Sequence, residues 1–395
     1  MTPRQKTDDK PLTNLPMVHP WLASRKVAAR AAIVLLVLGI AVSPRHFVER
    51  CLIASGSMLT IGLGGLFFIL LHHALGARWS TVAVRHMRCS LQFIIASVVF
   101  LAPLLWRSGD TWGWFAQHTL PDAKAALNDA YYQGRFMLLR LVVCYLAWLG
   151  LAYAYTNRTP TDTAPNHDTL KLQRLRFFSG PALVVFAVTI TSFSFDWVMR
   201  LQRGWHSAVF GIYIFSGSVS AALAFLALFT LARDHFSAQT QGMDLDGRHD
   251  IAKLLFGFVV FWAYIAFSQY LLMWYANLPI EMAFYRRRSA HVWQWLTLSL
   301  IAFQFIIPFV VLLSARAKRS TPTSGFAGLC VVAGHFLDWY WLVLPALYPE
   351  GAPLGVADAI VLAATALTMG TIIMGGLNHE LRLVQPEPIW GAAAE

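Results

Sequence analysis

Residues 192–224, with the sequence SFSFDWVMRLQRGWHSAVFGIYIFSGSVSAALA, join two long apolar segments through a short polar corner. The corner contains Asp196, Arg200, Arg203 and His206. Ionisable side chains are costly at the edge of a hydrocarbon layer, so their presence between two apolar segments indicates a functional site. We therefore expect the rest of the chain to supply walls and partners for this corner.

The composition of the chain is that of a membrane protein. Of its 395 residues, 57% are hydrophobic and 13% are charged, whereas soluble domains carry about 25% charged residues. The net charge of +11 does not indicate nucleic-acid binding, because the basic residues lie at the ends of apolar segments and not along one soluble face. We predict an all-α polytopic membrane protein that contacts lipid and does not bind nucleic acid.

Ten segments are apolar enough to be membrane spans, each of which needs about 20 apolar residues. The first is the weakest, because Arg30 lies inside it and Pro44 cuts it short. The predicted spans are residues 27–43, 51–75, 87–106, 136–155, 177–197, 206–232, 252–275, 292–314, 325–347 and 355–377. The predicted units are an N-terminal tail at 1–26, four spans within 27–155, a polar linker at 156–171, six spans within 172–377 and a C-terminal tail at 378–395.

The orientation follows from the basic residues of the loops. Lys and Arg are more frequent in the loops on the side that holds both termini, and such an excess marks the cytoplasmic side of a membrane. We therefore expect a multi-pass protein with both termini in the cytoplasm. The corner between Asp196 and His206 then faces the periplasm.

Further polar residues lie in or beside the later spans. Span 252–275 carries polar side chains close to one helical face and leads to an acidic residue at its outer end, and span 325–347 carries a His and an Asp three residues apart. Buried carboxyl and imidazole groups can exchange protons near neutral pH, and they also suit the carbonyls of a quinone head group. The residues predicted to form a polar path from the membrane middle to its outer face are Asp196, His206, Tyr264, Ser268, Glu281, His335 and Asp338.

Simpler interpretations exist for several of these residues. His335 can be an interhelical hydrogen-bonding residue only, and Asp196 can pair with Arg200 one turn later. Asp338 favours a functional role, because a carboxylate near the bilayer centre costs about 2.5 to 3.5 kcal/mol on insertion scales. Two further groups have structural explanations: a solvated loop for Glu281 with Arg286, Arg287 and Arg288, and close helix packing for Gly211, Gly217, Ala221 and Ala222.

The sequence argues against a metal or a covalently bound cofactor in this chain. The four cysteines, Cys51, Cys89, Cys144 and Cys330, form no CxxC or CxxCH pattern. Covalent c-type haem, CxxC zinc sites and cysteine-ligated clusters require such patterns. A b-type haem needs paired histidines at matching depth on facing helices, and the sequence offers no such set.

Three runs of the sequence resemble a known family. They are FDWVM at 195–199 followed by W-[HF]-S-x-x-F-G-x-Y at 205–213, FSQYLLMWYANLP at 267–279, and HFLDWYWLVLPAL at 335–347. The chain resembles the NrfD-type membrane subunits of the polysulfide-reductase superfamily over about residues 45 to 380. It is most similar to the second such subunit of alternative complex III, the bacterial quinol:cytochrome c (or oxidase) oxidoreductase.

The resemblance implies ten spans around two four-helix bundles in the inner membrane of a bacterium. It implies a sister NrfD-type membrane subunit, a periplasmic iron–sulfur protein, c-type cytochrome subunits and a terminal oxidase as partners, with quinone or quinol as the small-molecule ligand. Haem c and iron–sulfur clusters then belong to the partner subunits. The family assigns quinol oxidation to the sister subunit, so this chain is not catalytic alone and is a candidate for proton translocation.

The chain departs from the family pattern at one place. Where similar subunits carry L-[ED]-P-x-W, this chain has Leu201, Gln202, Arg203, Gly204 and Trp205, followed by His206. An acidic step of the implied proton path is therefore absent or replaced.

The sequence leaves three hypotheses. The first is a subunit of a quinol-oxidising respiratory complex that supports quinol oxidation and proton translocation through the polar path. The second is a secondary transporter for a small anion, with Arg200 and Arg203 as ligands. Such transporters commonly have matching broken helices in two halves, but Pro181 and Pro308 interrupt spans here without a match. The third is a purely structural anchor.

Overall fold

The structure is a computed structural model of the chain. It describes residues 25–42, 44–77, 79–106, 134–157, 169–202, 205–236, 243–351 and 355–384. All regular structure in these ranges is helical, and they contain no strand. Most of the predicted loop at 107–135, most of the predicted linker at 156–171, and Arg203 lie outside the described residues.

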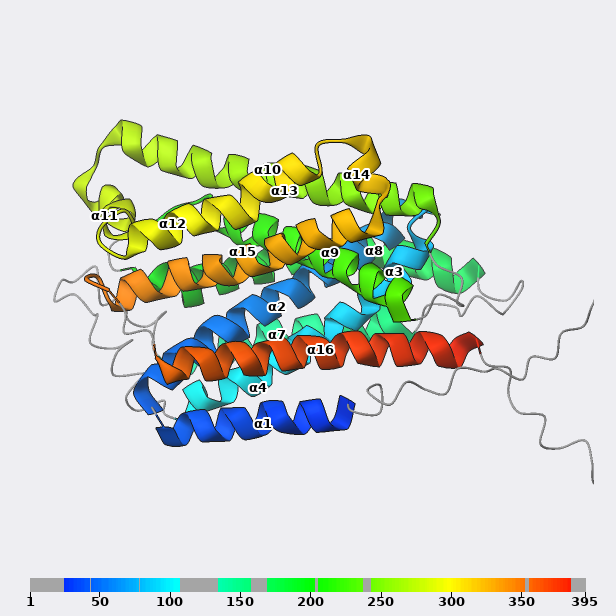
Figure 1. Cartoon of the computed structure of the whole chain (residues 1–395), viewed down its shortest axis with the longest axis horizontal. Helices are drawn as coiled ribbons and strands as arrows, with labels where there is room; N and C mark the ends of the chain where they lie inside the picture. Colours follow the sequence, from blue (N-terminus) through cyan, green and yellow to red (C-terminus); the bar gives the residue numbers. More distant parts are fainter. Residues whose placement is uncertain are drawn as a thin grey trace, which may run out of the picture.

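The long helices run roughly parallel to one another along the length of the molecule (Figure 1). The first long helix begins, and the last one ends, at the same end of the bundle. The long helices are α1 (Arg25–Val42), α2 (Pro44–Leu75), α4 (Gln92–Trp106), α7 (Gly134–Asn157), α8 (Thr169–Phe193), α9 (Phe210–Phe236), α10 (Leu245–Ala276), α15 (Thr321–Leu347) and α16 (Val356–Val384). A further long helical stretch, Trp293–Val311, begins with α12 (Trp293–Ile301).

Short helical segments extend or connect these helices. Two of them are π-helical turns inside longer spans, a feature that is frequent at functional sites. The two π-turns are Ser194–Val198 after α8 and Ala302–Ile306 after α12. The other short segments are α3 (Thr81–Met87) and the 3₁₀ turn Arg88–Leu91 before α4, the 3₁₀ turn Met199–Leu201, α11 (Pro279–Arg288), α13 (Ile307–Val311) and α14 (Ala315–Arg319).

Nine of the described helical stretches are long and apolar enough to cross a membrane. The apolar part of α1, Val27–Ile40, is shorter, in line with its prediction as the weakest span. The all-α polytopic membrane fold is therefore confirmed. The helices extend beyond several predicted ends, since α16 runs to Val384, while α9 begins at Phe210 and leaves His206 in the preceding loop.

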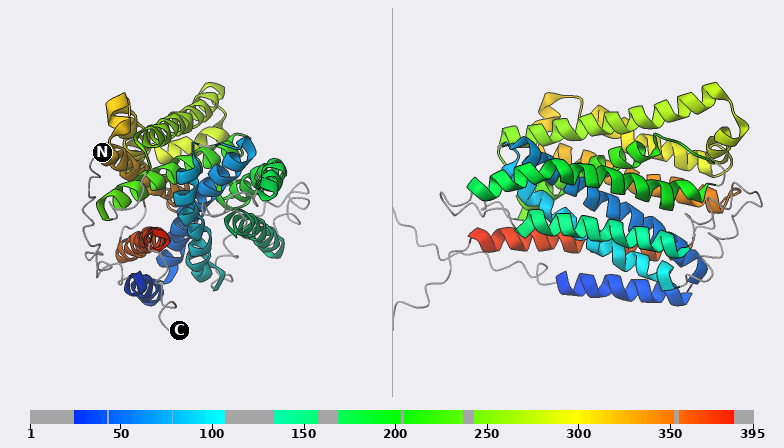
Figure 2. Two further views of the ribbon diagram at one scale, coloured as in Figure 1. Left: turned by 90° about the vertical axis from the view of Figure 1, so that its right-hand side faces the viewer. Right: turned by 180° about the vertical axis from the view of Figure 1, so that it is seen from behind.

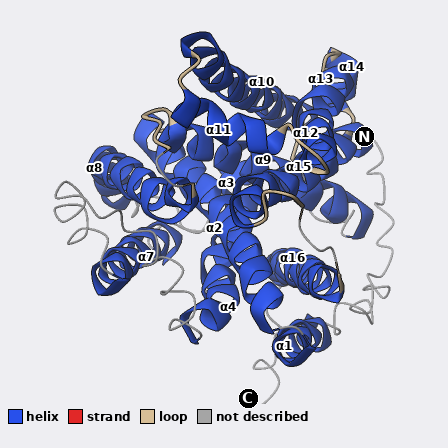
Figure 3. Cartoon of the chain, turned by 90° about the vertical axis from the view of Figure 1, so that its left-hand side faces the viewer, coloured by secondary structure: helices blue, strands red, loops and turns tan. Residues whose placement is uncertain are grey.

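The spans form two groups of four helices. One group comprises α2, α4, α7 and α8, and the other comprises α9, α10, the α12–α13 span and α15. The groups meet where α2 packs against α9 and α15, and the end-on view in Figure 3 shows these three helices at the centre. The remaining pair, α1 and α16, lies beside α2 at the edge, as Figure 2 also shows.

Small residues allow the central helices to approach closely. A Cβ on Gly64 of α2 would lie 2.0 Å from the backbone oxygen of Ser218 on α9 and 2.8 Å from the Cβ of Ala222. Without a hydrophobic force between helices in lipid, such close van der Waals packing is a main source of their association. The predicted packing role therefore fits Ala222.

The segment 279–288 differs from the predicted solvated loop. It forms α11, and the side chain of Arg288 is 1% exposed. Pro345 interrupts α15 and has no N–H for the carbonyl of Trp341 four residues earlier. Arg288 Nε donates to that carbonyl at 2.9 Å, and the guanidinium stacks 3.5 Å from the Phe284 ring centroid. The third arginine of this run thus caps an interrupted helix and is not a solvated charge.

Candidate functional site

Asp338 lies in the interior of the second helix group. Its side chain is 3% exposed, and the hydroxyl of Tyr213 on α9 donates a short hydrogen bond to its Oδ1. No basic group in the described ranges forms a salt bridge with it, and Arg288 acts on it electrostatically from a greater distance. A buried carboxyl that has a hydroxyl donor but no adjacent counter-ion is suited to take up and release a proton.

His335 lies one helical turn earlier on α15 and connects to the first helix group. Its side chain is 2% exposed, and its Nε2 lies 2.8 Å from Thr60 Oγ1 on α2. The indole Nε1 of Trp339 donates to the same hydroxyl oxygen at 3.2 Å. Thr60 therefore joins two side chains of α15 to α2, at the contact between the two helix groups.

One tautomer of His335 is consistent with the hydrogen-bond donors and acceptors around Thr60. The hydroxyl can donate one hydrogen bond and accept two, and it donates to the carbonyl of Gly56 at 2.8 Å. Trp339 can only donate, so it uses one lone pair. His335 Nε2–H then donates to the second lone pair, which leaves Nδ1 as an acceptor with no protein partner.

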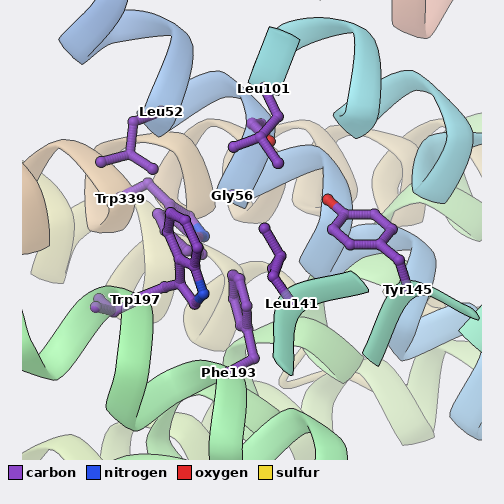
Figure 4. A pocket seen from close by; sticks show the side chains of 10 residues that line it. Leu52, Gly56, Leu101, Leu141, Tyr145, Phe193, Trp197 and Trp339 are labelled. Atoms are coloured by element: carbon purple, nitrogen blue, oxygen red, sulfur yellow. The ribbon is translucent and has the colours of Figure 1, made fainter. Parts of the chain in front are cut away.

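A narrow apolar slot lies beside the indole ring of Trp339 (Figure 4). Trp339 fits against α2 because Gly56 has no side chain, since a Cβ there would lie 2.1 Å from the indole ring. The slot has room for little more than a water molecule. Its lining residues come from both helix groups and are mostly apolar: Leu52, Ser55, Gly56, Leu101, Leu141, Tyr145, Phe193, Trp197, Val198 and Trp339.

Asp196 is buried away from Asp338, in the π-turn that follows α8. Its partner is Arg140 of α7, whose Nε lies 2.7 Å from Asp196 Oδ2. The alternative pairing with Arg200 one turn later is therefore replaced by an ion pair between two spans. The π-turn shifts the helical register at Asp196, and Arg200 follows it in a 3₁₀ turn. This ion pair joins α7 to the turn that follows α8.

The other residues of the predicted path do not join His335 and Asp338. His206 is exposed in the loop before α9, and Glu281 is half-exposed in the first turn of α11. Tyr264 is 64% exposed, and Ser268 donates to the carbonyl of Ile265 in its own helix. The predicted path is thus not continuous, because the polar face of α10 points outward.

Sequence reasoning missed the side chains that hold the buried pair. Tyr213 lies inside one of the quoted family runs, but nothing in that run marks it as the donor to Asp338. Thr60 is a single hydroxyl in an apolar span, and such residues commonly bond only to their own helix. Trp262 of α10 lies on the face opposite Tyr264, and its indole acts on Asp338 without reaching hydrogen-bond geometry.

Comparison with known proteins adds no family to this description. Neither a scan against models of protein families nor a search of curated proteins finds a match for the chain.

Proposed function

We propose that this chain is an integral membrane subunit of a quinol-oxidising respiratory complex of the alternative complex III type. Its role in the complex is to support quinol oxidation by moving protons through the membrane interior. The proposal draws on the three sequence runs that resemble NrfD-type subunits, and on the polytopic fold. The observation that carries it is the buried pair His335 and Asp338, each held by a hydroxyl from another span.

The pair is suited to proton transfer in three respects. Asp338 has no adjacent cation that would keep it permanently ionised, and Tyr213 can follow a change in its protonation by rotating its hydroxyl hydrogen. His335 can take up a proton at Nδ1 and release it again while Nε2–H keeps donating to Thr60. The residues span the contact between the two helix groups, so a proton step here can be coupled to a helix movement.

The slot beside Trp339 does not fit a quinone ring. Its aromatic and aliphatic walls suit an apolar ligand, but the space is close to that of one water molecule. We therefore derive no redox step within this chain. In this proposal the quinol is oxidised by the sister subunit, and the electrons pass to iron–sulfur and c-type haem groups of partner chains.

The outward face of α10 supports the presence of a membrane partner. Tyr264 lies near the middle of a 32-residue helix and is 64% exposed. A phenol hydroxyl is poorly accommodated by hydrocarbon, and polar side chains on membrane helices commonly bond to a neighbouring helix. A helix of the sister subunit covering this face would satisfy Tyr264. The proposed location is the bacterial inner membrane, with both termini in the cytoplasm.

The test is to purify the tagged protein from its native membrane in mild detergent. A reduced-minus-oxidised spectrum and mass identification of the co-purifying chains are then recorded. The proposal predicts c-type haem, an iron–sulfur protein and a second polytopic subunit in the preparation. A protein that purifies alone and without haem would contradict it.

A further inference from the structure

Gly217 of α9 faces a polar surface and not a tight helix contact. A Cβ added at Gly217 would lie 3.5 Å from Trp262 Cδ1, 3.7 Å from Trp262 Nε1 and 3.8 Å from His335 Nδ1, all ordinary contact distances. This differs from Gly64, where a Cβ would overlap a backbone oxygen of the neighbouring helix. The predicted packing role therefore does not explain Gly217, because an alanine would fit there.

The two nitrogen atoms that face Gly217 both lack a partner in hydrogen-bond geometry, although the indole of Trp262 lies close enough to the Asp338 carboxyl to act on it. Trp262 is 3% exposed and His335 is 2% exposed, so bulk water does not reach either atom. A buried polar atom without a partner is costly, because it loses its bond to water on folding and gains none in return. Two such atoms around one small space indicate that a polar group occupies it.

The chemistry of the two atoms identifies a group that fits both. The indole Nε1–H can only donate, and His335 Nδ1 accepts when Nε2 donates to Thr60. A water molecule accepts from the first and donates to the second, and its remaining proton is available to the Asp338 carboxylate. Buried waters typically bridge two to four otherwise unsatisfied polar groups in this way.

We propose that a water molecule binds beside Gly217, in the position that a side chain would occupy, and bridges Trp262, His335 and Asp338. It links the Thr60–His335 half of the site to the Asp338–Tyr213 half, which no direct hydrogen bond among the described residues joins. The water site itself depends only on the fold. Its use as a proton-conducting link rests on the proposed function.

The first test is a high-resolution cryo-electron microscopy map of the complete purified preparation. We expect density for an ordered water within hydrogen-bond distance of Trp262 Nε1 and His335 Nδ1. A map in which both side chains are well ordered and no such density is present would overturn the proposal.

The second test uses Gly217→Ala, whose methyl group would take the space of the water. Gly257→Ala on α10 is the matched control, because nothing lies within 4 Å of a Cβ at that position. Both exchanges raise helix propensity, but only Gly217→Ala would leave two buried nitrogen atoms without a partner. We therefore expect the thermal midpoint of unfolding to fall in Gly217→Ala and not in Gly257→Ala. We expect the water density to be lost in Gly217→Ala and retained in Gly257→Ala. Retention of the water in both variants would contradict the assigned position.

Measuring proton release per electron distinguishes the presence of the bound water from its role as a link in proton transfer. Loss of proton release in Gly217→Ala, with electron transfer and co-purifying subunits retained, supports the water as a link in the path. A bound water whose loss leaves proton release unchanged would refute its role as a link. A preparation without haem partners would refute the respiratory function, while the water density would still be expected.

Discussion

Arg288 offers a quantitative test of how α11 is held against the end of α15. Its guanidinium donates to the carbonyls of Trp341 at 2.9 Å, Leu342 at 3.0 Å and Phe284 at 2.9 Å. The Trp341 carbonyl depends on it most, because Pro345 supplies no N–H. The perturbation is Arg288→Lys, which keeps the positive charge but replaces the planar fork with a single ammonium group.

The magnitude follows from the bonds that Lys cannot make. A charged group contributes about 1.5–3 kcal/mol per hydrogen bond, and an ammonium at the end of a flexible stem cannot reach three carbonyls that a planar fork spans. The charge stays buried in both proteins, so the cost of burying it does not favour the variant. Losing one to two bonds predicts a fall in the free energy of unfolding of about 2–6 kcal/mol.

The assay is thermal unfolding of the purified protein in detergent. At about 2 °C per kcal/mol for a large chain, Arg288→Lys should lower the midpoint by about 4–12 °C. Arg286→Lys is the matched control, because Arg286 is exposed on the same helix, and it should change stability by no more than about 0.5 kcal/mol. Equal midpoints for the two variants would refute the capping role of Arg288.

Two further predictions concern helix packing and alkaline pH. Gly64→Ala places a methyl group 2.0 Å from the Ser218 backbone oxygen, so it should lower the free energy of unfolding by about 1–3 kcal/mol or more. Gly150→Ala is the control, because the space around its Cβ is open, and it should not lower stability. Equal thermal midpoints for the two variants would argue against a tight crossing of α2 and α9. Burial, aided by the hydrogen bond to Glu49, raises the pKa of Tyr348 from 10.0 to about 12. The resulting stabilisation is complete below pH 10 and is lost as the pH rises towards 12. The thermal midpoint of the natural protein should therefore fall more steeply over this range than the midpoint of Tyr348→Phe. Parallel curves for the two proteins would contradict the raised pKa of Tyr348.

Hydropathy was sufficient to predict nine of the ten spans as long apolar helices among the described residues, because the bilayer imposes a length and an apolar character on every crossing helix. It could not predict α11, since a short helix rich in arginine has the composition of a surface loop. The burial of Arg288 depends on a carbonyl released by Pro345, far away in the sequence. Such a partner is visible only after the two segments are packed together.

The sequence was sufficient to predict only part of the candidate site. His335 and Asp338 stand out in the sequence because ionisable groups are rare in membrane spans. Spacing along α10 identifies a polar face but not its direction, and Tyr264 turned out to lie on the exposed side. The simpler interpretation of Asp196 pairs it with Arg200, its neighbour in sequence, whereas its partner Arg140 comes from another span.

The proposed role of Asp338 is to carry protons for the complex. The test of this role is Asp338→Asn in the complete complex reconstituted into liposomes. The substitution keeps the shape and an acceptor for Tyr213 but removes the titratable proton. Proton release per electron is measured with a pH indicator during quinol-driven reduction of the acceptor. Our account predicts intact assembly with a strongly reduced proton yield. An unchanged yield in a fully assembled variant would contradict it.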